Sequence, residues 1–278
     1  MKLDLIIEPE QLEAYFNDPE LKANLKIIDL SQVQTYAQAH VPSAVHIKPF
    51  ELMGGIPPAT GKLPTLEQLS SLFARIGYSP EQHIVVYDDE GGGWAGRFIW
   101  TLDILGHKSY SYLNGGIHAW LKEGYSISDE SPQITPSNPS LTIHSKVLAE
   151  LDEVLESLED DNIKIWDARS AEEYAGTKIT AQRNGHIPGA VNLDWLDTID
   201  KNKNLRLLPL QQLQEKLSAL GIKTDNKIIT HCQSHHRSGL TYLIAKALGY
   251  DVKAYDGSWS EWGNHPHTPI EKYLTAKI

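Results

Sequence analysis

The second half of this 278-residue chain repeats short segments of the first half in the same order. Several matches in one register are hard to obtain by chance, so they predict two copies of one domain. The separation between matching residues is larger at the His40/His186 pair than at the Asp29/Asp167 pair, which predicts an insertion in the second copy within residues 176–185. The matching segments are Lys26–Leu30 with Lys164–Ala168, His40–His46 with His186–Asn192, and Leu113–Trp120 with Tyr255–Trp262.

A stretch between the two copies, residues 126–140, is rich in proline and serine and lacks any apolar period. Such composition between repeats is typical of a linker. We therefore expect an N-terminal domain over residues 1–127, a linker over 128–142 and a C-terminal domain over 143–278.

Within each copy, short runs of apolar residues alternate with segments of helical period. Strands alternating with helices predict an α/β fold, in which each domain is a mostly parallel sheet flanked by helices on both faces. Ligands of such sheets gather at the carboxyl ends of the strands. The predicted strands lie at residues 27–28, 84–87, 110–113 and 228–230, and the predicted helices at 66–76, 147–158 and 240–248.

The composition limits the compartment and the partners of the protein. A formal net charge of −11 opposes binding to nucleic acid, because a polyanion would be repelled at long range. The single cysteine, Cys232, excludes an intramolecular disulfide and any site built from several thiolates, which favours a reducing compartment. Residues 1–8 are too polar for a signal peptide, and no stretch is long enough to span a membrane. We expect a cytoplasmic monomer that binds neither nucleic acid nor membrane.

Cys232 lies in the segment His231–Gly239, between a predicted strand and a predicted helix. Backbone N–H groups of such a loop and the positive end of the helix favour a thiolate over a thiol. Arg237 adds a permanent positive charge, and His235 and His236 add charge when they are protonated. A buried structural cysteine rarely has so many polar neighbours, so we expect a nucleophilic sulfur that attacks an anion.

Together with the repeat, this loop resembles that of the tandem-domain rhodaneses, the thiosulfate sulfurtransferases, and the resemblance extends over nearly the whole chain. One bacterial subgroup has the active-site loop Cys-Gln-Thr-His-His-Arg, and Ser234 stands here in place of threonine. The resemblance implies two rhodanese-like domains, of which only the C-terminal one is active. It also implies that Cys232 takes a sulfane sulfur from thiosulfate, a small anionic donor, as a persulfide. The sulfur would pass to cyanide or another thiophilic acceptor, a protein included, with no cofactor and no metal.

The residue types around the cysteine suit that reaction. Attack on thiosulfate needs a site that stabilises first a dianion and then the departing sulfite. The planar guanidinium of Arg237 can hold two oxygens at once, which lysine cannot. Arg183, in the predicted insertion, could line the pocket or be a solvated charge of the loop. Trp195 could form an apolar wall of the pocket beside the thiolate or pack between the domains. The predicted substrate-binding residues are Gln233, Ser234, His235, His236, Arg237 and Arg183, with the two histidines supplying either charge or shape.

In the first copy, Asp88 stands at the position of Cys232. A carboxylate cannot carry sulfur, so we expect the first copy to be a scaffold. The sequence Gly91-x-Gly93-x-x-Gly96 that follows superficially matches a dinucleotide fingerprint. The carboxylates of residues 88–90 would repel a pyrophosphate, and the repeat already accounts for the position of these glycines.

Other cysteine chemistries remain open. Cysteine phosphatases and arsenate reductases, some of which share this fold, use Cys-x5-Arg, whereas four residues separate Cys232 from Arg237 here. The shorter loop makes a smaller cradle, suited to a persulfide rather than to a tetrahedral oxyanion. The histidines at 231, 235 and 236 are potential zinc ligands, although a loop wrapped around one thiolate leaves little room for a tetrahedral site. A non-catalytic binding module is the third possibility, against which the intact cysteine and arginine argue.

Several residues recur in both copies without clear chemistry. Asp29 and Asp167 follow matching strands, and because one copy lacks the cysteine we expect them to cap helices rather than to catalyse. Gly116 and Ser258 also match, and each is followed four residues later by a tryptophan. We expect these two pairs to be turn and core residues.

Overall fold

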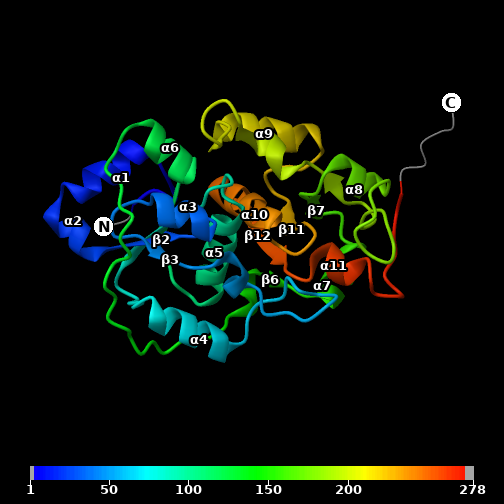
Figure 1. Cartoon of the computed structure of the whole chain (residues 1–278). Coiled ribbons are helices and arrows are strands. Elements are labelled where there is room, and N and C mark those ends of the chain that lie inside the picture. The colour runs from blue at the N-terminus through cyan, green and yellow to red at the C-terminus, as the bar shows by residue number, and fades with distance from the viewer. Residues whose placement is uncertain (1–2, 273–278) are drawn as a thin grey trace. The chain divides into compact units, whose positions relative to one another are not determined.

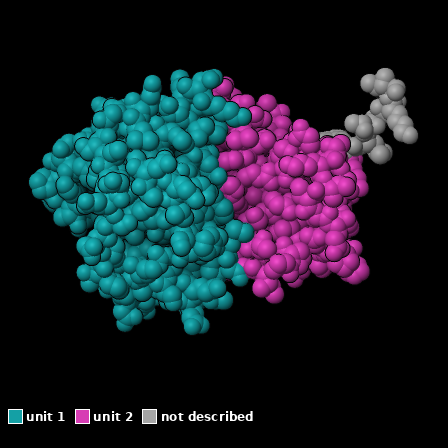
Figure 2. All heavy atoms as spheres, viewed as in Figure 1, with its two compact units in different colours: residues 1–54, 64–144, 199–207 teal, residues 55–63, 145–198, 208–278 magenta. Residues whose placement is uncertain are grey.

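The computed structural model describes residues 3–272, which form two compact units. Unit 1 comprises residues 1–54, 64–144 and 199–207, and unit 2 comprises residues 55–63, 145–198 and 208–278 (Figure 2). Each half of the chain therefore gives one short segment to the unit that the other half builds. The predicted boundaries differ from this division, because they assume contiguous domains and because the predicted linker, 128–142, lies in unit 1.

Each unit contains a five-stranded sheet in which every pair of neighbouring strands is parallel. The strand orders, β1-β5-β4-β2-β3 and β6-β12-β11-β7-β8, correspond strand by strand, which confirms the repeat. The first sheet consists of β1 (Ile6–Ile7), β2 (Leu25–Asp29), β3 (Val45–His46), β4 (His83–Tyr87) and β5 (Tyr110–Leu113). The second consists of β6 (Leu148–Ala149), β7 (Ile163–Asp167), β8 (Val191–Asn192), β11 (Lys227–His231) and β12 (Asp251–Tyr255).

Helices cover both faces of each sheet, as predicted (Figure 1). In unit 1, Leu12, Tyr36 and Trp120 join one apolar cluster on one face. On the other face, Phe73 and Phe98 stack with ring centroids 5.7 Å apart. The helices of unit 1 are α1 (Pro9–Phe16), α2 (Pro19–Asn24), α3 (Val33–Gln38), η1 (Pro49–Leu52), α4 (Leu66–Arg75), α5 (Gly93–Ile104) and α6 (Gly116–Lys122). Those of unit 2 are η2 (Ser145–Val147), α7 (Leu151–Ser157), α8 (Ala171–Ala175), η3 (Trp195–Thr198), α9 (Leu210–Ala219), α10 (Arg237–Ala247) and α11 (Ser258–Trp262). Over residues 3–272, no helix has both the length and the apolar character needed to cross a bilayer.

The two exchanged segments are held by matching contacts. In unit 1, residues 199–207 form a hairpin of β9 (Ile199–Asp200) and β10 (Arg206–Leu207), and the Leu207 N–H donates to Asn114 Oδ1 at 2.8 Å. In unit 2, the Leu63 N–H donates to Asp256 Oδ2, also at 2.8 Å. The repeat therefore extends to the way in which each segment is anchored.

Two local predictions were wrong. Of the predicted helix 147–158, only Leu151–Ser157 is α-helical, because Leu148 pairs with Ala254 as an edge strand of the sheet. Asp29 and Asp167 do not cap helices, since Ser170 caps α8 and Asp29 accepts a hydrogen bond from the Ser31 N–H at 2.6 Å. The helices begin several residues after the strands end, beyond the reach of these short carboxylates.

Candidate active site

Cys232 directly follows β11, which lies between β12 and β7 near the middle of its sheet. Its side chain is buried, and α10 begins five residues later at Arg237. The cysteine therefore lies at the carboxyl end of an inner strand and beside the start of a helix, as the sequence predicted.

The hydroxyl of Ser258 organises the loop that starts at Cys232. Its Oγ accepts the N–H of Cys232 at 3.3 Å and the N–H of His235 at 3.1 Å, and it donates to the carbonyl of Tyr255 at 2.8 Å. The matched residue in unit 1 is Gly116, and both residues have φ of 52°. From its sequence context, Ser258 is expected only to be a turn residue. The signal in the sequence was a serine where the other copy has glycine. Serine rarely adopts a backbone conformation with positive φ, so a serine there indicates a specific role.

The surroundings of the Cys232 thiol favour its ionised form. Burial raises the pKa of the thiol, but the charge of Arg237 and hydrogen bonds from the hydroxyl and N–H of Ser238 outweigh burial, with a smaller contribution from His236. The net effect is a pKa below the usual value. A thiolate, rather than a thiol, is the nucleophile in cysteine chemistry.

Arg237 forms a two-point ion pair with Glu173 of α8. Its Nη1 lies 2.6 Å from Oε2 and its Nη2 lies 3.0 Å from Oε1 of that carboxylate. Burial raises the pKa of Glu173, but the hydrogen bonds and charge of Arg237 hold it below the usual value. Glu173 was not among the predicted site residues, and its only signal in the sequence is the Ser170-x-x-Glu173 capping box at the start of α8.

The other predicted loop residues have separate contacts. His235 is buried with φ of 54°, and its Nδ1 lies 2.8 Å from Ser238 Oγ, which points to a role in loop shape. The ring of His236 lies 5.7 Å from that of the buried Trp195. The Gln233 amide donates to the carbonyl of Thr180 at 3.0 Å. The carbonyl of Ser234 lies against Gly61, from the segment that the first half of the chain contributes.

The contacts of Arg183 do not place it at the loop. Its Nη1 donates to the Thr268 carbonyl at 2.7 Å and its Nη2 to the Trp262 carbonyl at 2.9 Å. The insertion folds back on the segment after α11, so this guanidinium satisfies backbone carbonyls there. These contacts indicate a structural role for Arg183, and substrate binding by this residue stays a prediction.

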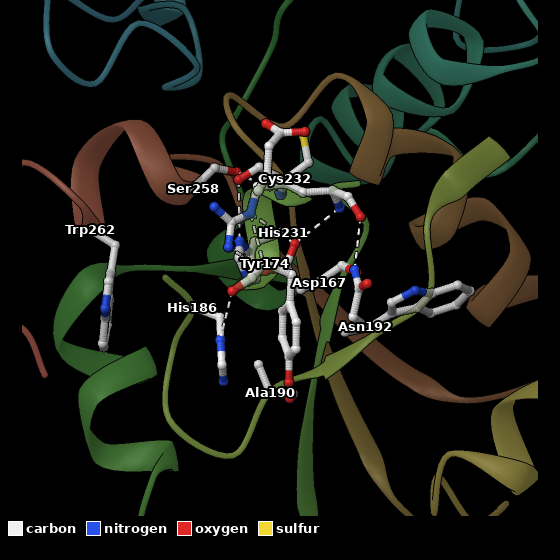
Figure 3. Close-up of polar contacts among 12 residues, drawn as sticks. Asp167, Tyr174, His186, Ala190, Asn192, His231, Cys232, Ser258 and Trp262 are labelled. Carbon is white, nitrogen blue, oxygen red and sulfur yellow. Dashed lines mark hydrogen bonds and ion pairs between the residues drawn. The ribbon is translucent and has the colours of Figure 1, made fainter. Parts of the chain in front are cut away.

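Asp167, Arg169 and His231 form a fully buried polar cluster. Figure 3 shows Asp167 and His231 beneath Cys232. Arg169 Nη2 lies 2.5 Å from Asp167 Oδ2, and His231 Nε2 lies 3.5 Å from the same oxygen. Burial lowers the pKa of His231 to about 4 despite the nearby carboxylate, so the imidazole is neutral at pH 7. The Arg169 guanidinium also lies 4.3 Å from the ring of Trp259, and the backbone N–H of Trp259 donates to the Cys232 carbonyl at 2.9 Å. This cluster supports the cysteine backbone from beneath.

In unit 1, the carboxylate of Asp88 accepts the N–H groups of the loop that follows it. Oδ1 accepts from Glu90 and Gly91 at 3.1 Å and from Gly92 at 2.8 Å, and Oδ2 accepts from Ala95 at 3.0 Å. An internal anion therefore already uses the amides that a dinucleotide pyrophosphate would need. Unit 1 offers neither a thiol nor an open phosphate cradle at this position.

Potential metal ligands do not converge around the thiol. Among residues 3–272, no group of three or more histidine, cysteine, aspartate or glutamate side chains is arranged to hold a metal ion. The ring of His231 is directed to Asp167 and that of His235 to Ser238, so neither is oriented as a shared ligand with Cys232.

Two corresponding parallel sheets in one chain, of which one carries a buried cysteine after its central strand, define a class of tandem α/β proteins. The model of the rhodanese-like domain matches this chain twice, over residues 8–123 and 150–265, and the chain belongs to the rhodanese family. It is 50% identical to a thiosulfate sulfurtransferase of Azotobacter vinelandii over 97% of both chains. A thiosulfate sulfurtransferase of Pseudomonas aeruginosa is 47% identical over the same shares.

A solved structure shares the fold at much lower identity. The anaerobic ergothioneine biosynthesis enzyme from Chlorobium limicola, in complex with trimethyl histidine, superposes with a TM-score of 0.85 at 18% identity. The match covers 96% of this chain and 70% of that one. At this identity the likeness supports the architecture alone.

Proposed function

We propose that this protein is a thiosulfate sulfurtransferase that carries sulfur as a persulfide on Cys232. The observation that carries the proposal is a buried thiol at the carboxyl end of β11, where the charge of Arg237 and hydrogen bonds from Ser238 favour the thiolate. The thiosulfate sulfurtransferases that are 50% and 47% identical over nearly the whole chain support the same activity. The protein acts as a cytoplasmic monomer, in keeping with its single cysteine and its net charge of −11.

In the first half-reaction, the Cys232 thiolate attacks the outer sulfur of thiosulfate. The bond between the two sulfurs of thiosulfate breaks, and sulfite leaves with the bonding electron pair. The product is a persulfide anion on Cys232, so charge is conserved and no proton is needed. The positive charge of Arg237 and the loop N–H groups that Ser258 does not accept lower the energy of the incoming dianion and of the departing sulfite.

In the second half-reaction, a thiophilic acceptor attacks the outer sulfur of the persulfide. With cyanide, a carbon–sulfur bond forms, thiocyanate leaves and the thiolate is regenerated. In the cell the acceptor is a small thiophile or a protein thiol that reaches the same sulfur. Because sulfite leaves before the acceptor reacts, the two substrates never share the site.

The activity is tested by thiocyanate formation from thiosulfate and cyanide. Initial rates should give parallel double-reciprocal lines, and intersecting lines would require a ternary complex instead. Cys232→Ser should retain less than about a thousandth of the wild-type rate, because a serine alkoxide is not accessible at neutral pH. The intact mass after thiosulfate treatment should increase by one sulfur atom in the wild type only. If the wild-type protein forms no thiocyanate, a non-catalytic binding module would describe it better.

The phosphatase alternative finds no support in the loop geometry. Four residues separate Cys232 from Arg237, one fewer than in the Cys-x5-Arg loop of the cysteine phosphatases. Hydrolysis of an aryl phosphate by the wild-type protein at a rate above its thiocyanate formation would contradict the assignment.

A further inference from the structure

A segment from the half of the chain without the cysteine forms part of the catalytic unit. Residues 55–63 precede α4 in sequence, yet they belong to unit 2 (Figure 2). In Figure 1 this segment is the light-blue loop beside α7, where Lys62 meets Glu150, the residue before that helix. We call residues 55–63 the strap.

The strap touches the catalytic loop at Gly61. A Cβ atom on this glycine would lie 2.6 Å from the carbonyl carbon of Ser234 and 2.6 Å from the carbonyl oxygen of Asp256, and closer still to the Ser234 oxygen. All three atoms are backbone atoms, which cannot move aside as a flexible side chain can. The φ angle of Gly61 is not among the positive ones, so only this close approach requires glycine. The backbone of Ser234 thus rests directly on the strap.

The next two strap residues, Lys62 and Leu63, hold Asp256, in the turn that leads to Ser258. Lys62 Nζ lies 2.6 Å from Glu150 Oε2 and 3.2 Å from Asp256 Oδ1, and the Leu63 N–H donates to Asp256 Oδ2. Asp256 is buried and lies two residues before Ser258. The strap therefore fixes the turn whose serine accepts the N–H groups at the start of the catalytic loop.

The other unit has the same anchor, but its hairpin meets the corresponding loop through side chains: a Cβ atom on Gly91 would lie 3.0 Å from Ile199 Cδ1 and 3.5 Å from the Cβ of Leu205. In unit 1, Arg206 takes the place of Lys62 and pairs with Glu8 at 3.0 Å and with Glu123. The residue before it is Leu205, where the strap has Gly61. The glycine occurs in the unit that holds Cys232 and not in its counterpart, which links it to the catalytic loop rather than to the repeat.

We propose that the strap positions the Cys232 loop for sulfur transfer, with Gly61 and Lys62 as its positioning residues. The measurement of thiosulfate turnover rests on the proposed function. The measurement of Cys232 alkylation reports on the state of the thiol whether or not the protein transfers sulfur. Neither residue touches the reacting sulfur atoms in this account. They act by holding Ser234 and the Asp256 turn, so that the Ser238 and Arg237 contacts that lower the thiol pKa are kept.

The test compares two strap variants with a matched variant of the other anchor. Gly61→Ala adds the methyl group that has no space, and Lys62→Met removes the charge at similar length. Arg206→Met breaks the corresponding anchor in unit 1. Two readouts are measured: the pH dependence of Cys232 alkylation by iodoacetamide, and kcat and KM for thiosulfate. Urea unfolding shows which variants are folded.

Gly61→Ala should raise the midpoint pH of alkylation and lower kcat by about a hundredfold, since displacements of about 1 Å at a reacting group can have effects of that size. Lys62→Met should shift both readouts in the same direction by less, and Lys62→Arg should restore them. Arg206→Met should leave the alkylation profile and kcat at wild-type values. A strap role limited to stability would change unfolding but not the alkylation midpoint.

Wild-type alkylation and turnover in folded Gly61→Ala would overturn the proposal. Equal loss of activity in Arg206→Met would also overturn it, because the anchors would then act through general stability. If Gly61→Ala does not fold, Lys62→Met and its rescue by arginine decide the question. If the wild-type protein fails to transfer sulfur, the proposed function falls, while the alkylation profiles still decide whether the strap holds the thiol.

Discussion

Arg237 and Glu173 are paired through two hydrogen bonds, of 2.6 Å and 3.0 Å, although 64 residues separate them in the chain. The pair joins the first turn of α10 to α8 beside Cys232. Glu173 is buried, so the arginine is held by a carboxylate that water does not screen. A guanidinium held in this way keeps its charge near the thiolate without having to be ordered again in each turnover.

Removal of the Glu173 charge should therefore weaken both activity and stability. In Glu173→Gln the arginine loses its charged partner, and we expect thiosulfate turnover to fall roughly tenfold or more. Breaking a buried ion pair typically costs about 3–5 kcal/mol, and the lower end applies here because the amide still accepts a hydrogen bond. Turnover and urea unfolding measure the two effects. The matched control is Glu172→Gln, an exposed position in the same helix, which should leave both at wild-type values.

Replacing Ser258 by glycine tests the hydroxyl without straining the backbone. Glycine tolerates the φ of 52° at this position, and glycine is the residue at the matched position in unit 1. Loss of Oγ leaves the N–H groups of Cys232 and His235 without this acceptor, at a cost of about 1–3 kcal/mol. We expect kcat to fall roughly tenfold or more. Ser157→Ala, which removes a buried hydroxyl from α7, should lose stability without a comparable loss of kcat.

The pH dependence of Cys232 follows from the sign of its pKa shift. Because the pKa of the Cys232 thiol in the folded protein is below its usual value, the thiolate contributes stability at pH above the unfolded pKa, and this contribution is lost as pH falls through the folded pKa. Alkylation of the folded protein should therefore level off at a lower pH than alkylation of the urea-unfolded protein. Arg237→Ala should move the folded midpoint upward, and Arg237→Lys should move it less. Identical midpoints for folded and unfolded protein would contradict the thiolate account.

Asp88 should matter for the stability of unit 1 and not for the chemistry. Asp88→Ala removes the acceptor for four backbone N–H groups in a buried loop. We expect the free energy of unfolding to fall by about 3 kcal/mol. This loss is at least as large as the penalty for leaving one buried donor without a hydrogen bond. The kcat for thiosulfate should stay close to wild type in conditions where the variant is folded. A large loss of kcat without a loss of stability would show that unit 1 contributes to the reaction.

Much of the fold could be predicted from local pattern. The strand predicted at residues 110–113 matches β5 residue for residue, because short apolar runs bounded by turn residues have few other stable structures. The repeat predicted two equivalent sheets, and both have the same strand order. The error at Leu148 arose where an edge strand of two residues adjoins a helix, since both patterns place apolar residues toward one core.

The sequence by itself determined the architecture, the position of Cys232 at the carboxyl end of a strand and the absence of a thiol in the first copy. These follow from residues that are neighbours in the chain, whose spacing can be read directly. Only the tertiary structure decided that Glu173 holds Arg237, that Ser258 supports the loop, that Arg183 binds backbone carbonyls and that residues 55–63 belong to the catalytic unit. The physical reason is that hydrogen bonds and ion pairs depend on side-chain positions within a few ångströms, and packing sets those positions between segments that are far apart in sequence.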